Sequence, residues 1–270
     1  MAAASLKRVP DSGTLFSFTM LLFCLFSIVF SPLSAAGQCV AEKNEAYHKV
    51  KYVHDGDTLH LVGGQKVRLI GINTPELERD KKPAEPFGME ARDALRQLLN
   101  VGTRIGVQYG RERADRHGRV LAHLYLEDGR SVQQWLLEKG YAMAIAIPPN
   151  LYHVDCYQKS EQLARIKRQG LWQGGGPEVL DATALRRGDQ GFAQIRGRVS
   201  QVKWTKKWIW VSFSEESSVR ISRDDVHYFE KGLLSSLAQK EVVARGWLTQ
   251  RKGRWSMRIQ HPAVLKVIDD

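Results

Sequence analysis

Several common signatures are missing from this sequence, and each absence removes a class of protein. Only 3 of its 270 residues are cysteine, so it is not a small scaffold held together by disulfides. The sequence has no phosphate-binding Gly-rich loop, dinucleotide fingerprint, paired Cys-x-x-Cys, His-Glu-x-x-His zinc motif or nucleophile elbow. Its single long apolar run excludes a membrane protein with many spans.

The composition is that of a folded chain with an excess of positive charge. Hydrophobic residues make up 43% and charged residues 26%, a balance typical of globular proteins and not of disordered chains. Lysine and arginine number 40 against 29 acidic residues, which gives a formal net charge of +11. Such a surface attracts a polyanion, which can be nucleic acid, anionic lipid or an acidic protein. The charge alone does not choose among these partners.

The N-terminus has the pattern of a secretory signal peptide. Two basic residues precede the apolar run Leu15–Phe30, Pro32 ends the run, and small residues follow at positions 34–36. We therefore predict that residues 1–36 are removed on export to the periplasm or the extracellular space, leaving Gly37 as the first residue. The alternative is an uncleaved membrane anchor, although the run is short for a bilayer span of about 20 residues.

Cleavage would leave two cysteines, Cys39 and Cys156, in an oxidising compartment. An even pair of cysteines in an exported protein is consistent with a disulfide that ties the N-terminus to the main domain. Two unpaired buried thiols are the alternative, because the sequence does not fix the distance between them.

A Gly-rich linker divides the remaining chain. The predicted linker is 174–177, Gly-Gly-Gly-Pro, because three glycines and a proline do not fit inside a packed helix or strand. It separates a domain at 37–173 from a smaller one at 178–270. Residues 37–177 contain 21 basic and 17 acidic residues, and residues 178–270 contain 17 and 11. The smaller domain is thus the more basic one.

The first domain is predicted to be α+β, with five strands and three helices built on a small barrel. Alternating and β-branched segments predict the strands, and apolar spacing with capping signals predicts the helices. The strands are predicted at Val50–Val53, Leu59–Val62, Lys66–Ile72, Arg104–Tyr109 and Val120–Leu126, and the helices at Pro83–Asn100, Ser131–Gly140 and Asp155–Gly170.

Charged residues that could take part in catalysis or metal binding lie in three short segments, His54–Thr58, Val67–Glu76 and Asp115–Leu121. Arg68 interrupts a run of Val, Leu and Ile, where a charge is costly unless an anion faces it, and a structural carboxylate would serve as well as a ligand. Carboxylates and carbonyl oxygens are the ligands that Ca²⁺ and Mg²⁺ prefer. Together with two arginines, they suit the hydrolysis of a phosphodiester.

The segment from about Tyr47 to Trp172 resembles the staphylococcal nuclease, or thermonuclease, family. The matching motifs are Asp-Gly-Asp-Thr, Arg-Leu-Ile-Gly-Ile-Asn-Thr-Pro-Glu, Phe-Gly-x-Glu-Ala, Asp-Arg-His-Gly-Arg-Val-Leu-Ala and the closing Gly-Leu-Trp. The resemblance implies a five-stranded OB-type barrel with three helices. It also implies Ca²⁺-dependent cleavage of DNA and RNA at the P–O5′ bond, which leaves 3′-phosphates; Mg²⁺ or Mn²⁺ are secondary choices of metal.

The same resemblance assigns roles to residues of the three motifs. It implies that Glu76 activates water and that Arg68 and Arg119 bind the phosphate and stabilise the transition state. The implied calcium ligands are Asp57, Asn73 and the backbone carbonyl of Thr74. The implied supporting carboxylates are Asp55 and Asp115.

Two departures from the family pattern affect the expected site. The family has an aspartate where this chain has Asn73, so one negative charge is lost and the affinity for calcium should fall. Ile145 and Ile147 stand where the best-matching family member has tyrosines that contact the nucleotide, and His117 replaces an aromatic residue. Cleavage needs none of these three side chains directly.

The second domain is predicted to be a smaller OB-like barrel that binds nucleic acid. Strands and one amphipathic helix are predicted at Ala193–Val202, Trp208–Phe213, Val219–Ser222, Asp224–Gln239 (the helix), Val242–Gln250, Trp255–Ile259 and Ala263–Ile268. Tryptophans interleaved with basic residues are typical of surfaces that hold single-stranded nucleic acid, although some of the tryptophans must lie in the core. The candidate binding residues are Lys203, Lys206, Lys207, Trp208, Arg251, Lys252 and Arg254.

Two functions remain open from the sequence. The favoured one is an exported, monomeric, metal-dependent nuclease acting on DNA or RNA, most readily in single-stranded form. The alternative is a catalytically silent nucleic-acid-binding protein. Glu76 and the two arginines favour the enzyme, whereas Asn73 favours the silent protein.

Overall fold

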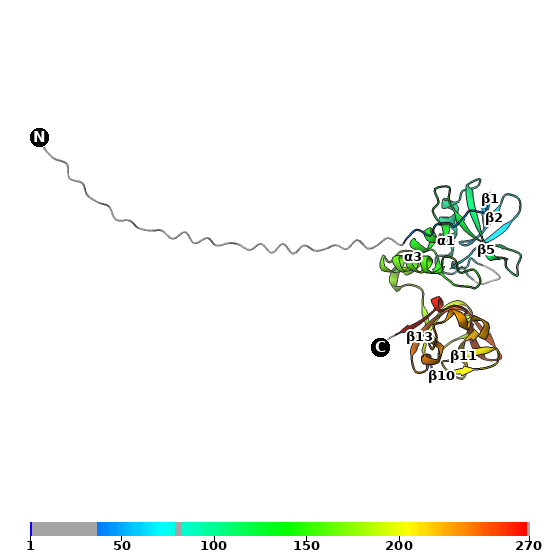
Figure 1. Ribbon diagram of the computed structural model, residues 1–270, viewed down its shortest axis with the longest axis vertical. Helices are drawn as coiled ribbons and strands as arrows, with labels where there is room; N and C mark the ends of the chain where they lie inside the picture. The colour runs from blue at the N-terminus through cyan, green and yellow to red at the C-terminus, as the bar shows by residue number, and fades with distance from the viewer. Residues whose placement is uncertain (2–36, 79–82, 269–270) are drawn as a thin grey trace. The chain divides into compact units, whose positions relative to one another are not determined.

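The computed structural model describes Met1, residues 37–78 and residues 83–268 (Figure 1). Residues 2–36 of the predicted signal peptide at 1–36 lie outside the described residues. Within the described part of the chain, no helix is long and apolar enough to cross a membrane.

Five strands close into a barrel in the order β1-β2-β3-β6-β5, which confirms the predicted barrel. The strands are β1 (Ala46–Val53), β2 (Thr58–Leu61), β3 (Lys66–Leu69), β5 (Arg104–Ala114) and β6 (Val120–Tyr125). Strands β3 and β6 pair in parallel and the other neighbours pair antiparallel. The barrel therefore brings β3 beside β6, although α1 and β5 separate them in sequence.

The strand predicted at Lys66–Ile72 is broken into two pieces. Strand β3 ends at Leu69, and β4 (Ile72–Asn73) leaves the barrel to pair with β7 (Met143–Ala144). Gly71 sits at the break with φ +78°, and a Cβ there would lie 2.7 Å from the ring of Tyr157. Only glycine combines a favourable positive φ with the absence of a Cβ, so Gly71 allows the strand to break at this position.

Three helices cover the barrel, as predicted: α1 (Gly88–Leu98), α2 (Val132–Glu138) and α3 (Val154–Ile166). Ser131 caps α2, because its hydroxyl accepts a hydrogen bond from the backbone N–H of Gln134 at 3.2 Å. Buried side chains of the helices pack against the barrel interior and form one core with it. They include Leu95 of α1 and Leu99 just after it, Leu136 and Leu137 of α2, and Tyr157 of α3.

Cys39 and Cys156 form a disulfide, and Cys39 is only 2% exposed. The backbone N–H of Cys39 also donates to Oε1 of Gln134 in α2 at 2.8 Å. The predicted disulfide between the N-terminal segment and the main domain is therefore confirmed, and Cys156 lies in α3. Disulfides of this kind are typical of proteins that leave the reducing cytosol.

The C-terminal strands form an eight-stranded sheet in the order β10-β11-β12-β14-β13-β9-β8, with β15 also paired to β13. The strands are β8 (Val179–Asp181), β9 (Gly191–Arg198), β10 (Gln201–Trp204), β11 (Trp208–Ser212), β12 (Ser217–Ser222), β13 (Glu241–Arg251), β14 (Arg254–Arg258) and β15 (Leu265–Ile268). They enclose a second core that includes Ile195, Val211, Leu237 and Trp255.

The prediction of a second closed barrel is wrong for this sheet, because the terminal strands β8 and β10 do not pair with each other. The long strand β13 already pairs with β9, β14 and β15 along its length. The parallel pairing of β8 with β9 covers the edge that a closing strand would use.

The prediction of one amphipathic helix at Asp224–Gln239 is also wrong. Two short 3₁₀ helices replace it, η3 (Arg223–Tyr228) and η4 (Leu234–Leu237). Gly232, with φ +88°, lies between them and interrupts a continuous helix. The apolar face is nevertheless used, because Phe229, Leu234 and Leu237 are buried in the second core.

A buried ion pair joins the two parts of the chain across the predicted linker. Arg245 of β13 contacts Glu161 of α3, with Nη1–Oε2 and Nη2–Oε1 distances of 2.7 and 2.9 Å. The described residues from Gly37 onwards belong to one compact unit. The domain boundary at 174–177 therefore stays a prediction.

Candidate active site

Asp57 enters the barrel wall from a tight turn that precedes β2. The turn is closed by a hydrogen bond from His54 N–H to the carbonyl of Thr58 (2.9 Å), and Asp55 Oδ1 accepts from Asp57 N–H (3.0 Å). A Cβ on Gly56 would lie 2.7 Å from Thr74 Oγ1. The glycine thus lets the turn press against Thr74 and brings the two sequence motifs together.

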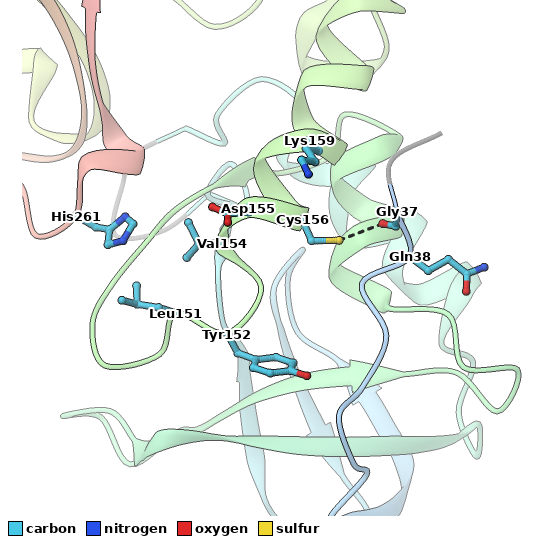
Figure 2. A pocket seen from close by; sticks show the side chains of 9 residues that line it. All are labelled: Gly37, Gln38, Leu151, Tyr152, Val154, Asp155, Cys156, Lys159 and His261. Atoms are coloured by element: carbon cyan, nitrogen blue, oxygen red, sulfur yellow. Dashed lines mark hydrogen bonds between the residues drawn. The ribbon is translucent and has the colours of Figure 1, made fainter. Parts of the chain in front are cut away.

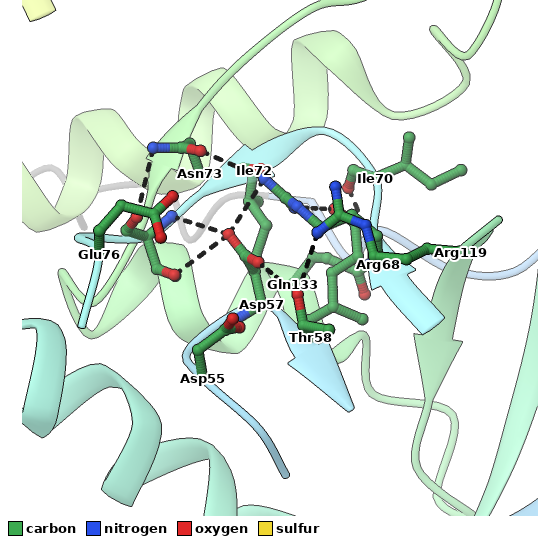
Figure 3. A network of polar contacts seen from close by, with 12 residues as sticks. Asp55, Asp57, Thr58, Arg68, Ile70, Ile72, Asn73, Glu76, Arg119 and Gln133 are labelled. Atoms are coloured by element: carbon green, nitrogen blue, oxygen red, sulfur yellow. Dashed lines mark hydrogen bonds and ion pairs between the residues drawn. The ribbon is translucent and has the colours of Figure 1, made fainter. Parts of the chain in front are cut away.

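The carboxylate of Asp57 is buried and fully engaged (Figure 3). Its Oδ2 accepts from Thr74 N–H at 3.2 Å and Thr74 Oγ1 at 3.1 Å, and lies 3.0 Å from Arg68 Nη2. Its Oδ1 accepts from Thr58 Oγ1 at 3.0 Å. These contacts fix the carboxylate beside β4.

Arg68 of β3 is the centre of this network, and its side chain is only 11% exposed. Its Nη1 donates to the carbonyls of Leu69 and Ile72, and its Nη2 donates to Asn73 Oδ1 at 3.2 Å. The anion expected to face Arg68 is therefore the internal carboxylate of Asp57, the structural alternative that the sequence left open.

Arg119 precedes β6 and reaches the same region from the neighbouring strand. Its Nε donates to Asp115 Oδ2 at 2.7 Å, and its Nη1 lies 3.5 Å from Thr58 Oγ1. Asp115 also accepts from the backbone N–H groups of His117 and Arg119. Although partial burial opposes it, these hydrogen bonds and the charge of Arg119 lower the pKa of Asp115. The supporting role of Asp115 stays a prediction.

Glu76 lies at the exposed edge of the network and differs electrostatically from the other acids. Partial desolvation raises its pKa, and the nearby charges of Asp57, Asp55 and Glu85 raise it further. The pKa of Asp55 is raised in the same way, first by desolvation and then by Asp57. The backbone N–H of Glu76 donates to Glu85 Oε2 at 3.0 Å. Crowded carboxylates of this kind create a negative potential that a cation would relieve.

The chain is similar in sequence to known proteins of one family. Residues 66–174 match the family described as staphylococcal nuclease homologue. The chain is 34% identical over 134 residues to the thermonuclease of Staphylococcus intermedius, covering 48% of this chain and 78% of that protein. It is 30% identical over 145 residues to the thermonuclease of Staphylococcus hyicus, covering 52% of this chain and 83% of that protein.

The chain belongs to the staphylococcal nuclease family. It is also 33% identical over 127 residues to endonuclease YncB and to the prophage-derived endonuclease YokF, both of Bacillus subtilis (strain 168). These alignments cover 45% of this chain, 59% of YncB and 42% of YokF. The chain therefore spans only about half the length of these two relatives.

The oxygen atoms available to a metal in this staphylococcal nuclease homologue come from few acidic side chains. No group of three or more His, Cys, Asp or Glu side chains within the described residues could hold a metal ion. The remaining donors are the Asp57 carboxylate, the amide oxygen of Asn73 and the carbonyl of Thr74, which accepts from Asn73 Nδ2 at 3.3 Å. All three are hard oxygen ligands, so their chemistry fits Ca²⁺.

A cavity of about 490 Å³ lies beside the disulfide and away from this network. Figure 2 shows its lining, which includes Gly37, Tyr152, Lys159 and His261. None of the residues expected to perform catalysis lines it. The candidate site is thus the partly buried charge network around Asp57 and Arg68 and not this pocket.

The basic residues predicted to bind nucleic acid fall into two groups in the C-terminal sheet. Lys206 and Lys207 lie in the turn between β10 and β11, and Lys203 and Trp208 flank it. Arg251, Lys252 and Arg254 lie at the turn between β13 and β14.

The strand register places these two groups at opposite ends of β12. Trp208 pairs with Ser222 at one end of β12, whereas Trp255 pairs with Ser217 at the other. The candidate residues therefore lie in two separate groups, and their role in binding nucleic acid stays a prediction. The prediction did not include Arg220, although Arg220 interrupts Val219 and Ile221 in the same way that Arg68 interrupts its own apolar run.

Proposed function

We propose that this protein is a Ca²⁺-dependent nuclease that hydrolyses phosphodiester bonds of DNA or RNA. The observation that carries the proposal is the assembly of Arg68, Arg119, Asp57 and Glu76 in one network of a staphylococcal nuclease homologue. Cleavage at the P–O5′ bond, which leaves a 3′-phosphate, is part of the proposal.

Asp57, Asn73 and Thr74 would hold the cation, with Asp55 supporting the turn that carries Asp57. A bound Ca²⁺ would supply positive charge to a non-bridging phosphate oxygen. Arg68 would exchange its 3.0 Å contact with Asp57 for the substrate phosphate, which frees Asp57 Oδ2 for the cation. Asn73 weakens this site because an amide carries no charge.

Glu76 would accept the proton of the attacking water, whose oxygen forms a bond to phosphorus as the P–O5′ bond breaks. Its raised pKa makes it a stronger base than an ordinary glutamate. Arg68 and Arg119 would stabilise the charge on the phosphate oxygens in the transition state, and Asp115 would orient Arg119.

The net positive charge supports a nucleic-acid substrate, and the N-terminal sequence supports export. The formal net charge of +11 favours a polyanionic substrate, and single strands bend most easily into a surface site. Export by a signal at 1–36 is consistent with the disulfide between Cys39 and Cys156. We propose a monomer with domains at 37–173 and 178–270.

The test is cleavage of single-stranded DNA and of RNA in millimolar Ca²⁺ and in EDTA. We expect shortening only with metal, and a loss of at least about 10²-fold in kcat for Glu76→Gln. Glu90→Gln is the matched control, because Glu90 is an exposed glutamate in the first turn of α1. Equal rates for Glu76→Gln and the wild type would refute the assigned base.

A specific observation favours the second candidate, a catalytically silent nucleic-acid-binding protein. Arg68 satisfies both Asp57 and Asn73 without any ligand, and Asn73 removes a metal carboxylate. Binding without cleavage at millimolar Ca²⁺, together with cleavage by Asn73→Asp, would identify the wild-type protein as this silent form.

A further inference from the structure

Two of the three proposed calcium ligands depend on a very small sheet, the pair of strands β4 and β7. Each strand has two residues, and Ile72 of β4 pairs with Ala144 of β7. A strand pair of this size is marginally stable at best on its own. Asn73 lies in β4 and Thr74 follows it directly, so the position of this sheet sets the position of both ligands.

The outer edge of β4 is fixed by the charged network of the candidate site (Figure 3). The carbonyl of Ile72 accepts from Arg68 Nη1 at 3.0 Å, and Asn73 Oδ1 accepts from Arg68 Nη2 at 3.2 Å. The backbone N–H of Thr74 donates to Asp57 Oδ2 at 3.2 Å. This edge of the small sheet therefore faces the groups proposed to meet the metal and the phosphate.

The outer edge of β7 is fixed by two charged side chains from other elements. The backbone N–H of Ala144 donates to Glu161 Oε2 at 2.6 Å, and its carbonyl accepts from Arg245 Nη1 at 3.0 Å. Both backbone groups that an edge strand leaves unpaired thus have a partner. Arg245 and Glu161 also pair with each other at 2.7 and 2.9 Å, and their side chains are only 12% and 7% exposed.

Arg245 is itself held in place by the C-terminal sheet. Its Nη2 donates to Oε1 of the buried Gln194, which lies opposite it in register on β9. Phe192 of the same strand packs against the apolar cluster that contains Met143 of β7. The sheet therefore contacts β7 at two points. Arg245 also lies outside residues 66–174, the segment that matches the nuclease family.

We propose that Arg245 is a positioning residue of the nuclease site, which fixes β7 and, through β7, fixes β4 with the calcium ligands Asn73 and Thr74. Arg245 itself would contact neither the metal nor the substrate. Residues that hold metal ligands in place affect metal affinity because they set the geometry of the ligand atoms. The inference rests on the proposed function, since it assigns Arg245 to that site. The placement of β4 is nevertheless measurable without metal and without cleavage.

The main variant combines Arg245→Met with Glu161→Leu, so that no lone buried charge is left to unfold the protein. Arg196→Met with Glu241→Leu is the matched control. It removes, by the same substitutions, a two-point pair of the C-terminal sheet at 2.9 and 2.7 Å that lies on the surface. Arg245→Lys is the conservative variant, because lysine keeps a charge for Glu161 and a donor for the Ala144 carbonyl.

The first measurement is hydrogen–deuterium exchange of the full-length protein in EDTA, followed by mass spectrometry. Exchange of residues 70–76 reports on β4, and exchange of residues 104–109 in β5 reports on unfolding of the barrel. We expect the ratio of the first rate to the second to rise roughly 2- to 30-fold in the main variant, the range for coupling through packed residues. The control should keep the wild-type ratio, and Arg245→Lys should restore most of it.

The second measurement is calcium affinity by titration calorimetry with EDTA-stripped protein. The main variant should bind Ca²⁺ more weakly by a similar factor, whereas the control should bind it as the wild type does. A purely structural role of Arg245 would accelerate exchange in both segments equally and would leave calcium affinity unchanged.

An unchanged ratio of exchange rates in the main variant, or an equal rise in the control, would overturn the placement of β4 by Arg245. A raised ratio with unchanged calcium affinity would overturn its role at the metal site. The nuclease proposal fails separately. A wild-type protein that neither binds Ca²⁺ nor cleaves would refute the nuclease, and the exchange ratio would still decide whether Arg245 positions β4.

Discussion

Replacing Glu161 with glutamine should destabilise the protein strongly, because Glu161 is a buried acid with several charged and polar partners. It is 5% exposed and accepts from Ala144 N–H at 2.6 Å. Arg165 Nε and both Nη atoms of Arg245 also donate to it. Arg245 in turn donates to the carbonyl of Ala144 at 3.0 Å. One carboxylate therefore holds α3, β7 and β13 together.

The expected magnitude follows from the charge that the substitution leaves behind. Glutamine keeps the size of the side chain but leaves Arg245 buried without a counter-charge, which typically costs about 3–5 kcal/mol. Although burial opposes it, the charges of Arg245 and Arg165 lower the pKa of Glu161. Its contribution is therefore present above the ordinary glutamate pKa and is lost as the pH falls through the lowered folded-state value.

The assay is urea unfolding at pH 7, with Glu241→Gln as the matched control. Glu241 forms an equally close two-point pair with Arg196 (2.9 and 2.7 Å), but on the solvent-exposed surface. We expect a large loss for Glu161→Gln, little change for Glu241→Gln, and partial recovery when Glu161→Leu is combined with Arg245→Met. Hydrogen exchange at Ala144 should also accelerate only in Glu161→Gln. Similar unfolding free energies for the two glutamine variants would refute the reasoning.

Three further predictions follow from other features. Removing the disulfide with Cys39→Ala and Cys156→Ala should cost about 2–5 kcal/mol in urea unfolding, given a separation of 117 residues, and a loss below about 1 kcal/mol would contradict the loop-closure argument. Burial lowers the pKa of His123 to about 3 and that of His153 to about 4, so the unfolded chain binds more protons below about pH 6.5. Stability should then fall on acidification by roughly 1–2 kcal/mol for each histidine at pH 5; a Tm that is flat between pH 7.5 and 5 would exclude this. Asn73→Asp should raise calcium affinity at least about tenfold by titration calorimetry with EDTA-stripped protein, and unchanged affinity would show that Asn73 lies outside the metal site.

Much of the barrel could be predicted because its strands and caps are local signals. Alternating apolar residues predicted the barrel strands, and Ser131 predicted the start of α2. The break after Leu69 was missed because the apolar run continues to Ile72, and only the contact between Gly71 and Tyr157 reveals why the strand must leave the barrel.

The C-terminal sheet was harder to predict because its closure depends on pairing between distant strands. The residues of β13 alone do not predict that this strand pairs with β9, β14 and β15. The helix predicted over Asp224–Gln239 had the correct apolar spacing, but Gly232 divides it into two 3₁₀ turns. Spacing reports which side chains are buried and not which hydrogen bonds the backbone forms.

In the candidate site, the sequence motifs predicted the residues, and the strand order of the barrel explains why they lie close together. Arg68 and Arg119 are far apart in sequence, and the parallel pairing of β3 with β6 brings them to neighbouring strands. The sequence could not show that Arg68 already contacts Asp57 and Asn73, because β4 reaches that position only by leaving the barrel.

The bond between Cys39 and Cys156 makes residues 39–156 a covalent ring that contains every strand of the barrel. A protease that cuts this ring once leaves the two pieces joined, so a nicked barrel can keep all its strands in place. A cut beyond Cys156, for example within 174–177, breaks the covalent connection to the C-terminal sheet and leaves only noncovalent contacts such as the Arg245–Glu161 pair. Resistance to a single cut is thus built into one part of the protein and absent from the other, which matters most where proteases are abundant.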